Sequence, residues 1–265
     1  MNNSIKNYTP FDLTRLRDLL GDLAGRFDVD HIVSCDSTNS QLLERATRGA
    51  PLGTAVVADI QTAGRGRRGR VWQSAPGHSL TFSLLWRFPD RFSLAGLSLA
   101  VGVAVARALE RCGVDGLALK WPNDIILDGR KLGGVLVEVA FDERGAAAVM
   151  GIGINLKSHP SWSNLEQPVA CLQDANCFAG REALLAFILG ELAIVMDSFS
   201  RDSFAALRDD WLARHAYQDL PVKINAESRQ LIGICRGVDG EGALLLESES
   251  GGLSVMNGDV TLRGA

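Results

Sequence analysis

The stretch TAVVADIQTAGRGRRGRVW, residues 54–72, decides between the fold classes open to this chain. Its first seven residues are mostly apolar and predict a strand over 54–60. Three glycines, Gly64, Gly66 and Gly69, then spell G-x-G-x-x-G, and four arginines stand between and beside them. A glycine pattern of this kind is informative only in its structural context, so the residues that follow it determine its meaning.

Two familiar folds use such glycines, and neither fits the rest of the chain. A dinucleotide-binding fold needs a helix that begins directly at the glycines, because the helix N-terminus holds the pyrophosphate. Residues 71–79 instead contain Gln-Ser-Ala-Pro-Gly, which does not begin a long helix. A protein kinase also needs His-Arg-Asp and Asp-Phe-Gly motifs, and the sequence contains neither. Both folds are therefore disfavoured.

The arginines of this stretch suggest an anion-binding loop. Arg65, Arg67, Arg68 and Arg70 repel one another, and the glycines keep the backbone flexible. Guanidinium groups bind phosphate and carboxylate through paired hydrogen bonds and keep their charge. We therefore expect a flexible flap that closes over a polyphosphate and a carboxylate. For the loop alone, a solvated basic turn and a nucleic-acid patch of the Arg/Gly type remain open.

Outward from this loop, the apolar pattern predicts short strands alternating with helices. The expected helices cover about 9–27, where Thr9 caps and Pro10 occupies the first turn, a segment after Asp36-Ser37-Thr38-Asn39, 93–111 and 181–216. The other expected strands are 31–35, 80–86, 117–120, 125–127, 135–139 and 147–154. This order predicts an α+β fold, a mixed β-sheet with packed helices, for a domain of residues 1–217. The Gly-rich residues 218–265 predict a small all-β domain.

Composition restricts the class of protein further. The net charge of −4 does not support a dedicated nucleic-acid binder. No uninterrupted apolar run reaches the roughly 18 residues that span a bilayer, and no secretory signal is visible, so we expect a cytoplasmic protein without a membrane partner. Five cysteines at wide spacings predict free thiols, and neither they nor the four histidines show zinc-ligand spacing.

Four further blocks occur in a fixed order around the loop, and with it they resemble the biotin–protein ligase family. The blocks are Asp36-Ser37-Thr38-Asn39, Lys120-Trp121-Pro122-Asn123-Asp124, Arg130 to Glu138, and Gly151 to Asn155. The resemblance is dense over about 32–156 and weaker to 216. It implies a fold of the class II aminoacyl-tRNA synthetase and biotin ligase type, ending in a small C-terminal β-barrel.

The resemblance also implies a two-step reaction. The carboxylate of biotin attacks the α-phosphate of ATP, supplied with Mg²⁺, and biotinyl-5′-AMP and pyrophosphate form. A lysine of the biotin carboxyl carrier protein, typically that of acetyl-CoA carboxylase, then attacks the mixed anhydride. The expected partners are thus biotin, ATP and the carrier protein, and a homodimer is allowed.

Site residues follow from the resemblance, together with the chemistry of each side chain. The catalytic residues would be Lys131, Arg65, Arg67 and Asp124, because attack of one anion on another requires charge neutralisation. The biotin site would comprise Ser37, Thr38, Asn39, Gln61, Gly64, Arg65, Gly66, Arg67, Lys131 and Gly134. The ATP and adenylate site would comprise Arg67, Arg68, Trp72, Lys120, Asn123, Lys131 and Asn155. The metal ligands stay unassigned.

Several of these residues also have simpler structural interpretations. Ser37, Thr38 and Asn39 fit ordinary helix capping, and Trp72 fits a core position. Lys131 fits a surface turn, and Asn123 with Asp124 fits a turn after a proline. Leu132, Val135 and Leu136 fit either the valeryl chain of biotin or ordinary core packing.

The region before the first block bears on regulation. Repressor-type members of the family carry a winged helix-turn-helix there, whereas only about 35 residues precede the block here, with one clear helix. We therefore expect no binding to a specific operator or other specific nucleic acid. Two alternatives stay open: a lipoate or octanoyl ligase on the same fold, and a nucleic-acid-binding module that uses Arg65 to Arg70.

Overall fold

The computed structural model describes residues 9–89, 92–164, 168–225, 230–249, 251–256 and 262–264. Their strands form two sheets. The larger sheet has seven strands in the order β1-β2-β3-β7-β6-β5-β4. These are β1 Asp28–Cys35, β2 Thr54–Gln61, β3 Ser79–Phe88, β4 Leu117–Lys120, β5 Asp124–Leu127, β6 Arg130–Asp142 and β7 Gly145–Asn155. Only β1 and β2 pair in parallel among these neighbours, which confirms the predicted mixed sheet.

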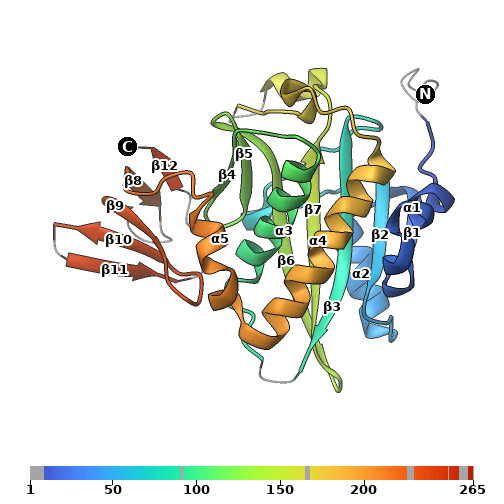
Figure 1. Ribbon diagram of the computed structural model, residues 1–265, viewed down its shortest axis with the longest axis horizontal. Helices are drawn as coiled ribbons and strands as arrows, with labels where there is room; N and C mark the ends of the chain where they lie inside the picture. Colours follow the sequence, from blue (N-terminus) through green and yellow to red (C-terminus); the bar gives the residue numbers. More distant parts are fainter. Residues whose placement is uncertain are drawn as a thin grey trace.

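Helices lie on both faces of this sheet. Helices α3 (Leu97–Arg111) and α4 (Arg181–Asp202) cover one face, with α1 (Leu13–Leu20) beside α4, and α2 (Thr38–Thr47) lies on the opposite face (Figure 1). Alternate residues of a strand point to opposite faces, so β7 serves both layers. Its Met150 belongs to the core beneath α3 and α4, whereas Val149 packs with Leu42 of α2.

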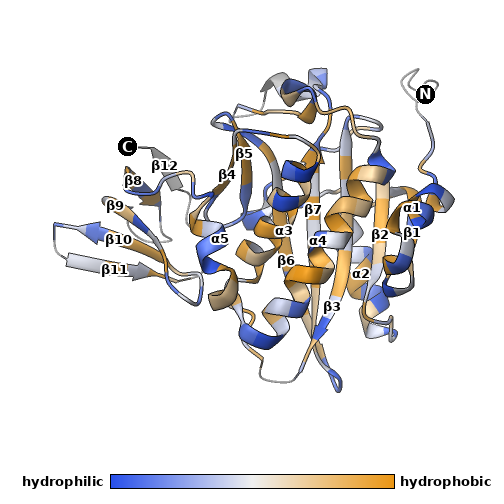
Figure 2. Cartoon of the chain, viewed as in Figure 1, coloured by the Kyte–Doolittle hydropathy of each residue, from blue (hydrophilic) through white to orange (hydrophobic). Residues whose placement is uncertain are grey.

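The main core lies between the sheet and the α3–α4 layer. Figure 2 shows this region as the most hydrophobic part of the chain. Helix α4 is long and apolar enough to cross a membrane by length and composition alone. Its Leu185, Ile188 and Leu192 are nevertheless fully buried within the core. That burial is typical of a core helix.

The smaller sheet has the order β11-β10-β9-β8-β12. Its strands are β8 Pro221–Asn225, β9 Gln230–Val238, β10 Leu244–Ser248, β11 Gly251–Val255 and β12 Leu262–Gly264. The predicted small β unit is therefore present, as an antiparallel sheet whose outer strands in the described residues are β11 and β12. Residues 1–8 of the predicted first domain and 257–261 of the second lie outside the described residues.

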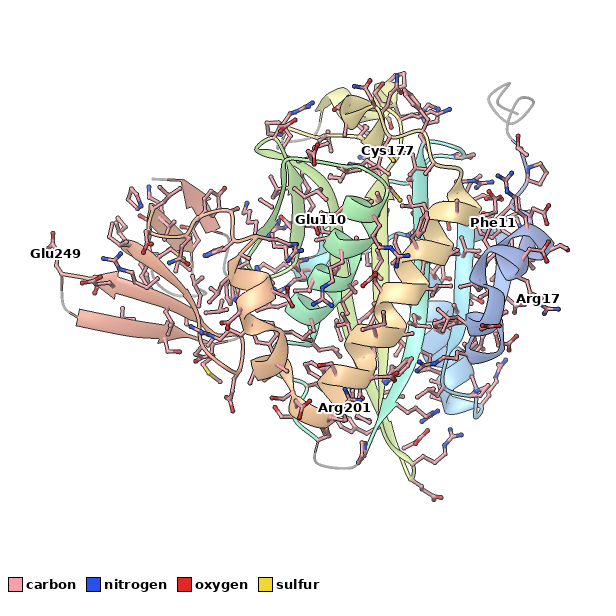
Figure 3. The ribbon with its side chains drawn as sticks, viewed as in Figure 1. Phe11, Arg17, Glu110, Cys177, Arg201 and Glu249 are labelled. Atoms are coloured by element: carbon pink, nitrogen blue, oxygen red, sulfur yellow. The ribbon has the colours of Figure 1, made fainter. Side chains whose placement is uncertain are left out.

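Specific contacts join the smaller sheet and its connecting segment to the larger sheet. The indole Nε1 of Trp121 donates to the carbonyl of Gly242 at 2.9 Å. Leu119 of β4 pairs with His215, which extends the edge of the large sheet by one short segment. Glu110 on α3, labelled in Figure 3, accepts from Arg214 Nε at 2.7 Å. The helix α5 (Arg208–Leu212) leads into this segment.

The first helix differs from its predicted bounds. It begins at Leu13, and the carboxylate of Asp12, not Thr9, caps it by accepting from the backbone N–H of Arg15 at 3.0 Å. It ends at Leu20, because Gly21 adopts φ 53°, a conformation that favours glycine. A 3₁₀ turn, Gly21–Arg26, fills the rest of the predicted helix.

Two later helices are also shorter than predicted. Helix α3 begins at Leu97 rather than at Ser93, after Gly96 with φ 76°. Helix α4 ends at Asp202, because Ser203 adopts φ 58°. The 3₁₀ turn Phe204–Leu207 and α5 follow in place of a continuous helix to 216. Three more 3₁₀ turns cover Arg67–Gly69, Pro160–Asn164 and Leu172–Ala175.

All five cysteines are free, as the sequence predicts. Burial raises the pKa of the Cys35, Cys112 and Cys171 thiols to about 11. The thiolate is the nucleophilic form, so burial keeps these thiols in the protonated, less nucleophilic form at neutral pH.

Candidate active site

A cavity of about 510 Å³ opens on the face of the large sheet that carries α2. The start of α2, the segment 61–73, and strands β3, β5, β6 and β7 all contribute to its walls. Fourteen of the sixteen predicted site residues line it: Ser37, Thr38, Asn39, Gln61, Arg65, Gly66, Arg67, Arg68, Trp72, Asn123, Asp124, Lys131, Gly134 and Asn155. The fold thus brings residues that span 119 positions of the sequence together around one cavity, although their roles stay predictions.

One wall is a buried chain of neutral polar groups at the start of α2. The backbone N–H of Thr38 donates to Gln61 Oε1 at 2.7 Å, and its hydroxyl lies 3.0 Å from the same oxygen. The hydroxyl of Ser83, on β3, lies 2.7 Å from Thr38 Oγ1 and 2.6 Å from Asn39 Oδ1. Ser83 is fully buried, and Thr38 and Asn39 are nearly so. Buried hydroxyls and amides of this kind can read a neutral polar ligand.

Two details of this wall could not be predicted from local sequence. Ser37 is the N-cap of α2, yet its side chain makes no capping hydrogen bond, so simple capping does not account for it. Ser83 was not among the predicted site residues. Its only signal is a hydroxyl in the largely apolar strand β3, and that signal is weak because the same strand holds other hydroxyls, at Ser79 and Thr81.

Glu138, at the rim, links this polar wall to the loop of arginines. Asn39 Nδ2 donates to Glu138 Oε2 at 2.8 Å. Arg65 Nη2 donates to both carboxylate oxygens of Glu138, at 2.9 and 3.1 Å. Arg65 Nη1 also donates to Ser40 Oγ at 2.7 Å. Glu138 ends one of the recognised blocks, but nothing in its local sequence predicts these partners.

The arginine loop, residues 64–72, takes the form of a small hairpin. Arg65 pairs with Val71, and Gly66 N donates to Arg70 O at 2.7 Å. Gly64 does not appear among the lining residues; a β carbon there would lie 2.4 Å from Trp72 O, so its role is to let the hairpin close. Arg68 adopts φ 60° at the turn. The predicted flexibility of the loop stays a prediction.

Lys131 and Asp124 form an ion pair inside the cavity. Lys131 Nζ lies 2.5 Å from Asp124 Oδ1, and their side chains are 25% and 11% exposed. Lys131 also pairs through its backbone with Val169, which fixes the strand that carries it. The ammonium is therefore a partly buried, oriented charge and not a surface turn residue. Lys120 does not line the cavity; it occupies the β4 position opposite Asp124.

The carboxylate of Asp124 also acts on Tyr217. Burial, and then the negative charge of Asp124, raise the pKa of the Tyr217 phenol. Tyr217 lies in the segment between α5 and β8, so the connection between the two sheets comes close to the cavity.

Trp72 and Asn155 line the part of the cavity formed by β7, and Trp72 packs against a glycine of that strand. The indole Nε1 of Trp72 donates to Thr81 Oγ1 at 3.4 Å, and a β carbon on Gly153 would lie 2.3 Å from the Trp72 ring. Asn155 Nδ2 donates to Ala170 O at 3.1 Å, so part of this amide ties β7 to the segment 169–171. Trp162, only 5% exposed, also lines the cavity and was missed in the sequence.

The apolar lining differs slightly from the expectation. Val135 and Leu136 line the cavity, as one of their two interpretations proposed. Leu132 is fully buried in the core and does not line the cavity. Strand alternation alone would place it on the same face as Gly134 and Leu136, but the register between β5 and β6 shifts at this residue, which turns its side chain to the opposite face.

The residues described here hold no cluster of three side chains that could form a dedicated metal site. The cavity carboxylate Asp124 is paired with Lys131. Mg²⁺ usually keeps several waters and needs only one or two carboxylates when substrate phosphates supply the other oxygens. The donor set therefore fits a magnesium ion that enters on ATP, with Asp124 as the available protein oxygen.

Comparisons with known proteins agree with this geometry. The model of the biotin/lipoate A/B protein ligase family matches residues 32–155. The bifunctional ligase/repressor BirA of Escherichia coli is 37% identical over 259 residues, which cover 97% of this chain and 80% of that protein. A biotin–[acetyl-CoA-carboxylase] ligase of Mycobacterium tuberculosis is 33% identical over 95% of both chains.

Solved structures show the same fold. The biotin protein ligase of Aquifex aeolicus, in complex with biotin and ATP, superposes with a TM-score of 0.79 at 29% identity. The match covers 90% of this chain and 99% of that one.

Proposed function

Because this chain belongs to the biotin/lipoate A/B protein ligase family, we propose that it is an ATP-dependent biotin–protein ligase. It forms biotinyl-5′-AMP from biotin and ATP and then transfers biotin to a lysine of a biotin carboxyl carrier protein. The observation that carries the proposal is a single cavity lined both by neutral polar groups, Thr38, Asn39 and Gln61, and by cations, Arg67 and Lys131.

The neutral polar wall suits the ureido head of biotin. That head has N–H donors and a carbonyl acceptor and carries no charge. Ser37, Thr38, Asn39 and Gln61 offer hydroxyl and amide groups of both kinds at a buried surface. Val135 and Leu136 supply apolar surface for the aliphatic chain.

The cationic part of the cavity suits adenylation. When a carboxylate attacks the α-phosphate of ATP, negative charges approach one another, and fixed positive charges lower the barrier. Lys131, held by Asp124, would place its ammonium between the two anions, and Arg65, Arg67 and Arg68 would cover the phosphates. Mg²⁺ on ATP would screen the phosphate charge, and Asp124, a carboxylate of the cavity lining, would be the protein residue able to supply an oxygen ligand.

The adenine and the second step involve fewer residues. Trp72 and Asn155, with Asn123 nearby, form the part of the lining proposed for the adenosine. Lys120, outside the lining, is a weaker candidate. In the second step the neutral amine of the carrier lysine attacks the carbonyl of the anhydride and AMP leaves, and Asp124, which lines the cavity, would receive the amine proton.

The test is a two-part assay with purified protein. Biotin, ATP and Mg²⁺ should release pyrophosphate, and addition of a carrier domain should give the biotinylated domain, detected by intact mass. Replacing the acceptor lysine of the carrier by arginine is the control for the second step. Failure to release pyrophosphate and to label the carrier would refute the proposal.

The two alternatives predict different outcomes in the same preparation. A lipoate or octanoyl ligase would transfer lipoate to its acceptor and leave biotin unused. A nucleic-acid-binding module would bind DNA or RNA without ATP, with steep salt dependence. A thermal shift with biotin and ATP but not with nucleic acid would separate the ligase from the binding module.

The remaining expectations complete this proposal. The chain would act in the cytoplasm on the carrier of acetyl-CoA carboxylase, without a membrane or operator partner. A homodimer stays a prediction, and analytical ultracentrifugation with and without biotin and ATP would test it.

A further inference from the structure

We propose that Glu138 is a positioning residue that fastens the arginine loop to the polar wall of the cavity. The inference rests on the proposed function, since that function explains why the two parts must be held together. Glu138 lies on β6, 99 positions from Asn39 and 73 from Arg65, yet hydrogen-bonds to both. One carboxylate therefore joins the start of α2 to the loop that covers the site.

The contacts to Arg65 favour a closed loop. Arg65 Nη2 approaches both oxygens of Glu138, and Nη1 reaches Ser40 on α2. Charge-assisted hydrogen bonds of this kind are stronger and more directional than neutral ones. The neighbouring Arg67, Arg68 and Arg70 carry the same charge as Arg65, so a carboxylate opposite the first arginine helps to offset the repulsion within the loop.

The contact to Asn39 fixes the direction of the polar wall. Glu138 Oε2 and the carbonyl of Leu136 both accept from Asn39 Nδ2, at 2.8 and 3.3 Å. With two acceptors on that side, the flipped amide would place oxygen against oxygen. Asn39 Oδ1 must therefore face Ser83, and it can accept the Ser83 hydroxyl proton at 2.6 Å.

This orientation determines what the rest of the wall offers to a ligand. If Ser83 donates to Asn39, the proton in its 2.7 Å contact with Thr38 comes from the Thr38 hydroxyl. Gln61 Oε1 accepts from the backbone N–H of Thr38 at 2.7 Å. Because Gln61 Oε1 faces Thr38, Gln61 Nε2 points away from Thr38. Each contact within the wall then has one defined donor and one defined acceptor. Glu138 would thus affect the affinity for biotin without touching it, and would leave the charge chemistry at Lys131 unchanged.

The test compares Glu138→Gln, which keeps the shape and removes the charge, with Glu44→Gln as a matched control. Glu44 pairs with Arg48 on α2, but both side chains are exposed, at 52% and 73%. Limited trypsin digestion of ligand-free protein, read by mass spectrometry, follows cleavage at the loop arginines. Calorimetry with biotin alone gives the dissociation constant, and pyrophosphate release gives kcat and KM.

We expect trypsin to cleave Glu138→Gln at the loop about tenfold faster than wild type. The variant should also bind biotin about tenfold more weakly, as the loss of one charge-assisted hydrogen bond implies. Its kcat at saturating biotin should fall less than its affinity, because Lys131 and Arg67 do not depend on Glu138, so most of the change appears in KM. Glu138→Asp, which keeps the charge, should restore part of the protection. It also serves as the probe if Glu138→Gln does not fold.

The outcomes separate this inference from the proposed function. If wild type binds biotin and Glu138→Gln shows the same loop cleavage and affinity, the positioning role is wrong. If kcat falls as much as affinity, Glu138 acts in the chemistry and the inference is again overturned. If wild type binds no biotin, the proposed function fails, while the ligand-free digestion still decides whether Glu138 holds the loop.

Discussion

Gly153 lies so close to Trp72 that a β carbon added to it would sit 2.3 Å from Cζ2 of the indole. Gly151, two positions earlier on β7, stands in the same relation to Asn39, whose Oδ1 would be 2.3 Å from the added carbon. Real side-chain contacts are not that short, so both neighbours would have to move. The absence of side chains at these two positions is what makes room for the cavity lining.

Gly151→Ala tests this relation directly. The new methyl group should displace Asn39, and we expect the affinity for biotin to fall at least about tenfold, because overpacking of this kind costs roughly 1–3 kcal/mol. Calorimetric titration with biotin measures the effect. Gly252→Ala, where a β carbon meets nothing within 4 Å, is the control and should bind normally. Unchanged affinity in Gly151→Ala would show that Asn39 has room to shift.

Lys131→Ala should slow formation of biotinyl-5′-AMP at least about a hundredfold, equivalent to roughly 2.7 kcal/mol of barrier. The reason is the loss of the ammonium that neutralises the approaching anions. Pyrophosphate release in a single turnover measures the rate. Lys157→Ala, at an exposed lysine just beyond β7, is the control. A near-normal rate in Lys131→Ala would remove this residue from the proposed chemistry.

Arg67→Ala should speed the dissociation of biotin several-fold and leave the melting temperature nearly unchanged, because the residue lies in a surface hairpin. Stopped-flow displacement of biotin measures the rate, and calorimetry the melting temperature. A large drop in melting temperature would instead make Arg67 part of the structural framework.

Asp59→Ala should destabilise the fold strongly without a direct effect on the site. Asp59 is 1% exposed and lies 2.7 Å from both His31 Nε2 and Arg181 Nη1. Removing it breaks a buried ion pair with Arg181, whose side chain is 12% exposed, and breaking such a pair costs about 3–5 kcal/mol. Urea denaturation measures the free energy of unfolding. Asp197→Ala breaks the exposed pair with Arg26 and should cost about 0–1 kcal/mol; equal losses would contradict the prediction.

Acid should weaken the fold through Asp142, at the tip of the β6–β7 hairpin. Hydrogen bonds from Arg144 hold the pKa of this carboxyl at about 2, below its ordinary 3.8. A depressed native pKa stabilises the fold above 3.8, and the contribution is lost as the pH falls toward 2. Asp142→Asn should therefore melt below wild type at pH 7, and the difference should vanish near pH 2. Melting curves across this range would show it; a constant difference would argue against the linkage.

The sequence predicts the large sheet well, because its strands are apolar runs bounded by glycine and polar turns. It is less informative at helix ends. Asp12 rather than Thr9 caps α1, and Gly96 and Ser203 adopt positive φ where the apolar pattern continues. These ends depend on backbone conformation and on tertiary contacts, which periodicity does not encode.

The site, like the fold, could be predicted only in part from the sequence. Residues within recognised blocks, such as Thr38 and Lys131, could be assigned from sequence. Ser83 and Trp162 could not, because each lies in a segment without a motif, and Glu138 could not, because its partners lie 99 and 73 positions away. Leu132 was open to two interpretations, and a register shift between β5 and β6, which the sequence pattern does not reveal, turns it into the core.

From residue 150 on, strand β7 alternates between two environments: Met150, Ile152 and Ile154 belong to the core, although Ile152 also reaches the cavity, and Gly151, Gly153 and Asn155 line the cavity. Over these residues, substitutions at even positions should mainly affect folding, and substitutions at odd positions should mainly affect which ligand binds. Redesign of the cavity for a bulkier or smaller vitamin analogue could therefore vary the residues that contact Gly151 and Gly153, namely Asn39 and Trp72, and leave the even-numbered core residues of β7 unchanged.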